Sequence, residues 1–173
     1  MLTKRMEDAL NKQIGLEAYA SFLYLSMSSW CDQEALGGCN AFMQRQSDEE
    51  KMHMLKLFHY VNEQDGHAIT PAIAQPPLDF GTIQEMFKMV YAHEQKVTKS
   101  INDLVVIAME EKDHATYNFL QWYVEEQREE EALMRSILDK IKLIGGGPQS
   151  LYYIDKEIEK LNKAEMKAEA AEA

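Results

Sequence analysis

The placement of glycine and proline constrains the fold of this chain more than any other feature of its sequence. The chain has 8 glycines and 4 prolines, and most of them lie at Gly37-Gly38, within residues 66–81, or between Gly145 and Pro148. Both residue types end helices, and the segments between these stretches carry apolar residues at helical spacing. The sequence therefore predicts long helices over residues 3–33, 40–64, 82–112 and 113–144, with Asp113 as an N-cap, and a shorter one with Leu151, Ile154, Ile158 and Leu161 on one face.

The lengths of the connections predict how these helices are arranged. Short turns join the first helix to the second and the third to the fourth, which makes each pair antiparallel. The middle connection, residues 66–81, has 16 residues and reaches up to about 50 Å when extended, whereas a helix of about 28 residues is about 42 Å long. It can therefore cross the bundle and make the second and third helices parallel. We predict an all-α fold, a four-helix bundle with one long crossover loop and a short fifth C-terminal helix.

Length and composition indicate one domain, at residues 1–162, followed by a solvated, frayed tail at residues 163–173. With 173 residues, 46% of them hydrophobic, the chain can bury a core without disulfides. Cys31 and Cys39 fit neither a disulfide framework nor a zinc pair, and we find neither a secretory signal nor a membrane-length apolar run, so we expect a cytoplasmic protein. The net charge of −11 disfavours nucleic acid and membranes as partners and favours cations.

Each long helix has an apolar stripe that an acidic residue interrupts near its middle. The interrupting residues are Glu17 in the first helix, Glu50 with His53 in the second, Glu94 in the third, and Gln127 with Glu130 in the fourth. Because each lies about halfway along its helix, they meet at one level whichever way the helices point. Buried carboxylates are unfavourable without a compensating charge, and the stripes contain no lysine or arginine. We therefore expect bound metal ions, with protonated carboxylic acids as the alternative.

The types of donor narrow the choice of metal. Any one glutamate in a helical seam is weak support for a metal site, because such side chains often reach solvent. Glu50 and His53, three residues apart, share one helix face and form a clamp for a divalent ion. Carboxylates with a single imidazole favour iron or manganese, and two bridged ions permit two-electron chemistry with dioxygen. Two roles are open for Tyr24. It can donate a hydrogen bond or an electron to this site, or it can be a core tyrosine that is hydrogen-bonded to a carboxylate.

The chain resembles the bacterial non-haem ferritin family over residues 1–162. It matches the motif of that family in order at Glu17, Tyr24, Glu49, Glu50, His53, Glu94, Trp122, Glu126, Gln127, Glu129 and Glu130. The resemblance implies a ferritin-like bundle, a hollow cage of twenty-four subunits, a ferroxidase centre in each subunit and storage of a ferric mineral. It also implies three iron positions: the first is bound by Glu17, Glu50 and His53, the second is bridged by Glu50 and held by Glu94 and Glu130, and the third is formed by Glu49, Glu126, Glu129 and Glu130.

Differences from neighbouring families add further predictions. The symmetric di-iron pattern has a second Glu-x-x-His, but the fourth helix here reads Gln127-Arg128-Glu129-Glu130, so we expect the second ion to be held more weakly. Bacterioferritins have a haem-binding methionine directly after the second-helix glutamate, where this chain has Lys51, so haem is not expected. The sequence has no paired-cysteine iron domain of the rubrerythrin type. The fifth helix, from Pro148 to Leu161, distinguishes the chain from DNA-coating mini-ferritins.

Three hypotheses for function follow. The first is an iron-storage ferroxidase that oxidises Fe(II) with dioxygen or hydrogen peroxide and deposits Fe(III) inside a homo-oligomeric cage. The second is a soluble di-iron redox enzyme that acts on an organic substrate or peroxide without storing iron. The third is a structural bundle whose buried acids are protonated. We assign internal hydrogen bonds to Gln13 and Gln46, and we expect His93 at the surface or beside the ligands.

Overall fold

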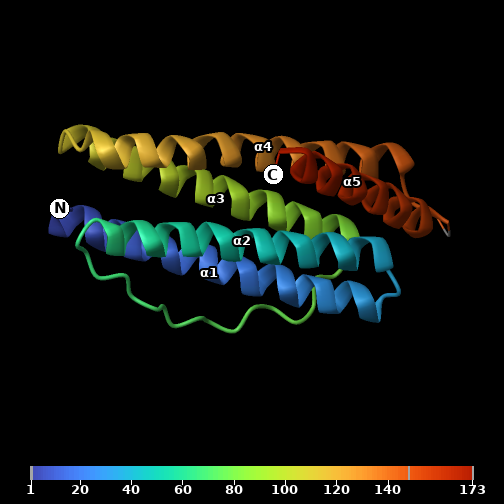
Figure 1. The fold of residues 1–173 in the computed structure, drawn as a ribbon. Helices are drawn as coiled ribbons and strands as arrows, with labels where there is room; N and C mark the ends of the chain where they lie inside the picture. Colours follow the sequence, from blue (N-terminus) through green and yellow to red (C-terminus); the bar gives the residue numbers. More distant parts are fainter. Residues whose placement is uncertain (1, 148, 173) are drawn as a thin grey trace.

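The structure, a computed structural model, describes residues 2–147 and 149–172, and these ranges contain five α-helices. The helices are α1 (Lys4–Gln33), α2 (Gly37–Glu63), α3 (Ile83–Glu110), α4 (His114–Ile144) and α5 (Ser150–Glu172). Helices α1 to α4 form a bundle, and α5 folds back along α2 and α4 (Figure 1). The predicted all-α four-helix bundle with a fifth C-terminal helix is confirmed.

The connection between α2 and α3, residues 64–82, has no helix or strand. It runs the length of the bundle, so α2 and α3 are parallel as predicted (Figure 1). Hydrogen bonds fasten it to α1. Asn11 Nδ2 donates to the carbonyl of His67 at 2.9 Å, and the Ile69 amide donates to Asn11 Oδ1 at 2.7 Å. Ser26 Oγ donates to the carbonyl of Pro77 at 2.7 Å, so α1 fixes both halves of the crossover.

Side-chain caps fix where three of the helices begin. Thr3 accepts a hydrogen bond from the first turn of α1, and Thr82 and Glu85 form a reciprocal capping box at α3. Asp113 Oδ1 accepts from the Thr116 amide at 3.0 Å, which confirms the predicted N-cap of α4. Such caps satisfy N–H groups that have no partner within the helix. They thereby fix the first turn of three helices that carry buried acids.

The start of α2 differs from the prediction. The sequence predicts that Gly37 and Gly38 separate two helices, but both lie in the first turn of α2. Residues 34–36 make the turn, and Ala35 has a φ of 59°. A Cβ at position 38 would lie 2.3 Å from the carbonyl oxygen of Asp155 in α5. Gly38 therefore permits the close approach of α5 and does not end a helix.

Helix α5 is longer than predicted. The sequence predicts a helix that ends near Leu161 and a frayed tail, whereas α5 continues to Glu172. The tail consists mostly of Ala, Glu and Lys, which are strong helix formers, and nothing in it stops the helix. Ile154 and Ile158 are buried as predicted, but Leu151 is 49% exposed. Met1, Pro148 and Ala173, which the predictions also include, lie outside the described residues.

The apolar core has two parts, one on each side of the middle of the bundle. One part includes Met27 and Phe87, and the other includes Leu10 and Ile101. The residues that were predicted to interrupt the apolar stripes, Glu17, Glu50, His53, Glu94, Gln127 and Glu130, are all buried. The acidic residues of the stripes lie between the two parts in each helix. The core therefore contains a polar layer at mid-height.

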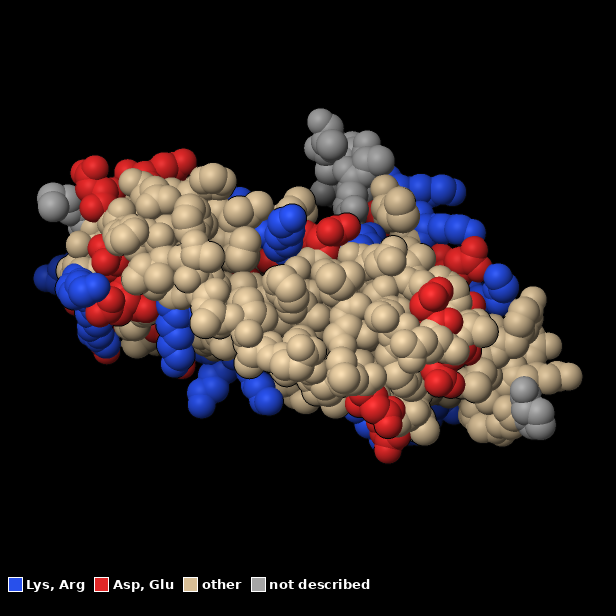
Figure 2. All heavy atoms as spheres, turned by 90° about the horizontal axis from the view of Figure 1, so that it is seen from below, with Lys and Arg blue, Asp and Glu red and all other residues tan. Residues whose placement is uncertain are grey.

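The surface on the side of the crossover carries few charged side chains at its centre (Figure 2). Large apolar side chains are exposed along α1 and the crossover, including Phe22, Leu25, Ile69 and Leu78. None of the helices within the described ranges has the length and apolar composition that crossing a membrane requires.

Candidate metal centre

A layer of polar side chains crosses the middle of the bundle between the two apolar parts of the core. Each of its members is at most 5% exposed. They are Gln13 and Glu17 of α1, Gln46, Glu50 and His53 of α2, Glu94 of α3, and Gln127 and Glu130 of α4. The burial that the sequence predicts for these residues is confirmed.

Glu17, Glu50 and His53 form a compact cluster, which we call the inner group. One ligand atom from each residue lies within 4.8 Å of the other two, and His53 Nδ1 lies 3.5 Å from Glu50 Oε2. Helix α2 supplies two of these residues because positions three apart share a helix face. Helix α1, antiparallel to α2, supplies the third. Two carboxylates and one imidazole at this spacing suit a first-row divalent ion such as Fe(II).

Two uncharged donors hold Glu94 of α3. The Tyr24 hydroxyl donates to Glu94 Oε1, and Gln127 Nε2 donates to Glu94 Oε2 at 3.0 Å. Tyr24 is thus bonded to a buried carboxylate, which both interpretations of this residue allow. Neither Glu94 nor Glu130 belongs to a cluster as compact as the inner group within the described part of the chain. Their roles as ligands of a second ion stay predictions.

Several buried carboxylate oxygens in the layer have no hydrogen-bond partner. Gln13 Nε2 donates to Glu17 Oε1 at 2.7 Å, and Gln46 Nε2 donates to Glu130 Oε1 at 3.2 Å, which confirms the internal hydrogen bonds predicted for both glutamines. The second oxygens of Glu17, Glu50 and Glu130 are buried and accept no hydrogen bond from an N–H or hydroxyl group of the chain. When protonated, the carboxyl groups of Glu17 and Glu50 hydrogen-bond to each other. Buried polar atoms are normally paired. Three unpaired oxygens in one layer therefore mark positions where cations would bind favourably.

Burial raises the pKa of the carboxyl groups in this layer. It is the largest cause for Glu17, Glu50 and Glu130, and neighbouring carboxylates raise each pKa further. Burial raises the pKa of Glu94 to about 7, although its hydrogen bonds with Tyr24 and Gln127 oppose the rise. Without metal ions, these groups keep protons at a pH where exposed glutamates are ionised. Cations that bind here displace those protons, so metal binding depends on pH.

Glu49, His53 and Glu126 form a second compact cluster, the outer group, which shares His53 with the inner group. One ligand atom from each lies within 4.8 Å of the other two, and both glutamates are half-buried. Together with Glu129 and Glu130, these glutamates line a cavity of about 320 Å³. The four residues of the predicted third iron position thus surround one cavity. The sequence reasoning missed that His53 joins this group, although the spacing of four from Glu49 was a signal.

Arg45 and His93 also lie next to the layer. Arg45 Nη1 lies 3.0 Å from Glu49 Oε2, a contact that the sequence reasoning did not anticipate although the two residues are four apart on one helix. His93 packs against the rings of Tyr19 and Tyr24, each with a centroid separation of 6.0 Å. Burial lowers the pKa of His93 to about 4. His93 was expected either at the surface or beside the predicted ligands. The structure places it beside them, against Tyr24.

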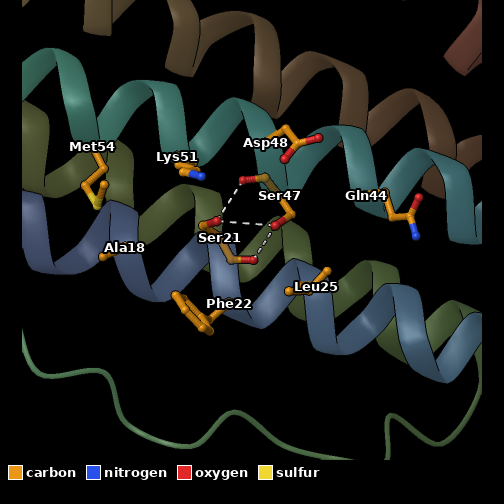
Figure 3. A pocket seen from close by; sticks show the side chains of 9 residues that line it. All are labelled: Ala18, Ser21, Phe22, Leu25, Gln44, Ser47, Asp48, Lys51 and Met54. Carbon is orange, nitrogen blue, oxygen red and sulfur yellow. Dashed lines mark hydrogen bonds between the residues drawn. The ribbon is translucent and has the colours of Figure 1, made fainter.

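A larger cavity, of about 420 Å³, lies on the outer face of α1 and α2 (Figure 3). The hydroxyls of Ser21 and Ser47 bridge the two helices there, each donating to the carbonyl of the other at 2.8 Å. Phe22 and Lys51 are among the lining residues. The residues of the inner and outer groups do not line this cavity, so it is separate from the metal centre.

Comparison with known proteins agrees with this geometry. The sequence profile of the ferritin-like domain matches residues 7–144, a range that contains every residue of the inner and outer groups. The chain belongs to the ferritin family. The resemblance drawn from the motif residues is confirmed, and the helices that carry both groups are the ones that the ferritin profile covers.

Relatives within the ferritin family match nearly the whole chain. A bacterial non-heme ferritin of Campylobacter jejuni is 48% identical over 161 residues, which are 93% of this chain and 96% of that protein. A bacterial non-heme ferritin of Escherichia coli O6:H1 is 42% identical over 162 residues, 94% of this chain and 98% of that protein. The structure of an open pore ferritin from Archaeoglobus fulgidus superposes with a TM-score of 0.89 at 45% identity, covering 92% of this chain and 98% of that one.

Proposed function

We propose that this member of the ferritin family is an iron-storage protein that oxidises Fe(II) at the inner group and stores the Fe(III) product. The observation that carries the proposal is the buried polar layer, in which all four bundle helices supply carboxylates and three carboxylate oxygens have no partner. Cations satisfy these oxygens better than any group of the chain itself. The relatives in Campylobacter jejuni and Escherichia coli, named bacterial non-heme ferritins, support this function.

Two Fe(II) ions bind in the layer as substrates. The first is bound by Glu17, Glu50 and His53, whose ligand atoms are already close together. Glu50, whose Oε2 accepts no hydrogen bond, bridges to the second ion.

Glu94 and Glu130 hold the second ion, next to Gln127. An amide stands here in place of a second imidazole, so the second ion is held more weakly and by oxygen atoms. Weak binding suits an ion that is oxidised and then leaves. Binding of the ion would change the hydrogen bonds that Glu94 and Glu130 accept in the metal-free protein. It would also release protons from these carboxyl groups.

The two ions together supply the two electrons of one oxidation cycle. Dioxygen takes up two electrons and two protons to give hydrogen peroxide, and hydrogen peroxide takes up the same number to give two water molecules. Either molecule balances the oxidation of two Fe(II) to two Fe(III), and we propose both as oxidants. Tyr24 donates a hydrogen bond to Glu94, and the two-electron balance requires no electron from it. The carboxylates that bind and orient the ions are the contribution of the chain.

A third iron position lies in the cavity beside the outer group. Its ligands are Glu49, Glu126, Glu129 and Glu130. Glu130 belongs to the buried layer and also lines this cavity, and His53 of the layer lies close to Glu49 and Glu126 in the cavity lining. Iron can therefore move outward by exchanging a few ligands at a time.

The stored product requires an enclosed space, which we propose is a cytoplasmic cage of twenty-four copies of this chain. The exposed apolar side chains on the crossover side support assembly: Phe22 is 52% exposed, Leu25 49% and Leu78 76%. This face has few charges at its centre (Figure 2). Contiguous apolar surface of this kind is typical of protein interfaces.

Substitution of Glu94 tests the proposed oxidation. Glu94→Ala should lower the initial rate of Fe(II) oxidation at least about 100-fold, since loss of a residue that only supports a metal ligand already lowers activity about 10- to 100-fold. Asp103→Ala, an exposed acid on the same helix, is the matched control and should oxidise iron at the parent rate. The rate is followed by the absorbance of Fe(III).

Native mass spectrometry of the iron-loaded protein is the companion measurement. A large cage that retains many iron atoms per chain agrees with storage. A small oligomer with two irons per chain would instead indicate a di-iron enzyme for an organic substrate. If Glu94→Ala oxidises iron as fast as the parent, the proposed site is wrong.

A further inference from the structure

Helix α5 extends along the bundle toward the outer group. The matches to the Campylobacter and Escherichia relatives include 161 and 162 of the 173 residues of this chain, and α5 continues to Glu172. Figure 1 shows that α5 runs from the end of α4 back toward mid-bundle. Its final turns therefore approach the level of the metal centre.

Specific contacts hold α5 in this position. Ile154 and Ile158 are buried against the bundle, and Asp155 Oδ1 accepts a hydrogen bond from the Cys39 amide at 2.9 Å. Asn162 is 6% exposed, and its Oδ1 accepts from Arg45 Nε at 2.8 Å. These contacts extend over more than two helical turns, so the docking of α5 is a built feature of the fold.

Glu165 lies three residues after Asn162 and therefore on the same face of α5. It is half-buried and lines the cavity of about 320 Å³ beside the outer group. Lys163, two residues before it, is paired instead with Glu159 at 2.6 Å. A carboxyl group from a third helix thus borders a cavity that α2 and α4 otherwise form.

Besides several acidic residues, the cavity has two further features that favour the binding of a cation. Its lining includes five glutamates and two arginines: Glu49, Glu126, Glu129, Glu130 and Glu165 with Arg45 and Arg128. One of these glutamates, Glu130, is 5% exposed and has a buried oxygen, Oε2, without a hydrogen-bond partner. Glu49 and Glu126 also lie within 4.8 Å of a ligand atom of His53. A buried oxygen without a hydrogen-bond partner in the lining, and an imidazole close behind two of the lining glutamates, favour a cation in this cavity.

We propose that Glu165 completes this cavity as a cation-binding site, through which iron passes between the inner group and the outside of the bundle. The proposal rests on the proposed iron chemistry and adds the C-terminal helix to it. Glu130 borders the ion from the buried side, Glu49 and Glu126 from α2 and α4, and Glu165 from α5. His53 lies close to Glu49 and Glu126. The position of α5 thereby sets how tightly iron is held on its way out.

Zinc titration of the assembled protein tests this inference without relying on oxidation. Isothermal calorimetry with Zn(II), which has no redox chemistry, reports the number and affinity of ions bound per chain. Glu165→Gln should raise the dissociation constant of the weakest class of ions about three- to tenfold and leave the tighter class unchanged, and Glu165→Lys should raise it further, because a positive charge repels the ion. Glu63→Gln, an exposed acid at the end of α2, makes the same change of charge and should match the parent.

The outcomes separate this inference from the proposed function. Zinc binding by Glu165→Gln and Glu165→Lys that equals the parent overturns the role of Glu165, while a slow Glu94→Ala variant would still support the oxidation site. A crystal of the zinc-loaded parent should show anomalous density in the cavity with a Glu165 oxygen about 2.0–2.2 Å from the ion. Density confined to the inner group would also overturn it.

Discussion

The inner and outer groups share His53 but differ in their surroundings. The carboxylates of the inner group are at most 1% exposed. Uncharged glutamine side chains donate hydrogen bonds to Glu17 and to the neighbouring Glu94. The carboxylates of the outer group are half-buried, and Arg45 forms an ion pair with one of them. Burial makes the inner group the place where a cation changes the free energy most, because an uncompensated charge there is the most unfavourable.

This difference fits the proposed iron path, in which the two groups have different roles. A buried site with a nearly fixed set of donors positions two ions for electron transfer, whereas an open site with a competing arginine releases ions easily. The proposed iron chemistry needs both properties, and one cluster cannot have both. The following predictions ask whether the two groups are as different as their burial suggests.

The largest expected effect is the difference in iron-oxidation rate between one substitution in the inner group and the same substitution in the outer group. Glu50→Gln should lower the initial rate of iron oxidation at least about 100-fold, because it removes the bridging charge of the inner group. Glu126→Gln should lower it less than about tenfold, because in the proposed path the outer group binds iron after oxidation. The rates are compared by Fe(III) absorbance, with Asp103→Asn as the control for lost charge. Equal losses in both variants would show that the two groups act as one site.

The raised pKa values of the buried carboxyl groups should lower the stability of the metal-free protein as pH rises, whereas the lowered pKa of His93 acts in the opposite direction below about pH 6.5. Glu94 has a pKa of about 7 in the folded chain against an ordinary value of 4.5, so between these values the folded chain keeps a proton that the unfolded chain releases. The free energy of unfolding is then greatest near pH 4.5 and falls toward pH 7, by an amount on the order of 3 kcal/mol from Glu94 alone. The midpoint of thermal unfolding, measured with chelator at pH 5 and pH 7.5, reports this loss.

Two controls accompany that measurement. Glu94→Gln has no carboxyl group at this position and should show a weaker dependence on pH. Saturating Zn(II) should oppose the loss, since a bound cation favours the ionised carboxylates. If the midpoint of Glu94→Gln changes between pH 5 and pH 7.5 by as much as that of the parent, the raised pKa of Glu94 is contradicted.

The docking of α5 should affect the outer group without disturbing the inner one. Gly38→Ala places a Cβ 2.3 Å from the carbonyl oxygen of Asp155, so it should destabilise the chain by about 1–3 kcal/mol through overpacking. Gly37→Ala, where a Cβ meets nothing within 4 Å, is the matched control and should be neutral or slightly stabilising. Chemical denaturation measures both. Iron oxidation by Gly38→Ala at the parent rate, with weaker zinc binding at the outer group, would agree with the distinction.

Much of the bundle could be predicted because the sequence repeats a simple pattern. Alternating steps of three and four residues identified the buried face of each long helix, and that face includes the acids at mid-height. Glu94 illustrates this, since Val90 and Val97 flank it on its stripe and all three are buried. The prediction failed at Gly38, where local composition does not reveal the approach of α5. It also failed after Leu161, where helix-forming residues continue α5.

The sequence by itself determined which residues of each helix face inward, because helical periodicity and the burial of apolar side chains act within one segment. It also placed acidic residues near the middle of all four long helices, and this pattern predicts a cation site. Only the tertiary structure decided which of these acids come together. His53 lies close to Glu17 on one side and to Glu49 and Glu126 on the other. Helix α5 brings Glu165 to the cavity that Glu49 and Glu126 line. The physical reason is that the axial register and rotation of packed helices depend on contacts between segments far apart in the chain, such as the approach of Asp155 to Gly38, and no pattern within one helix encodes them.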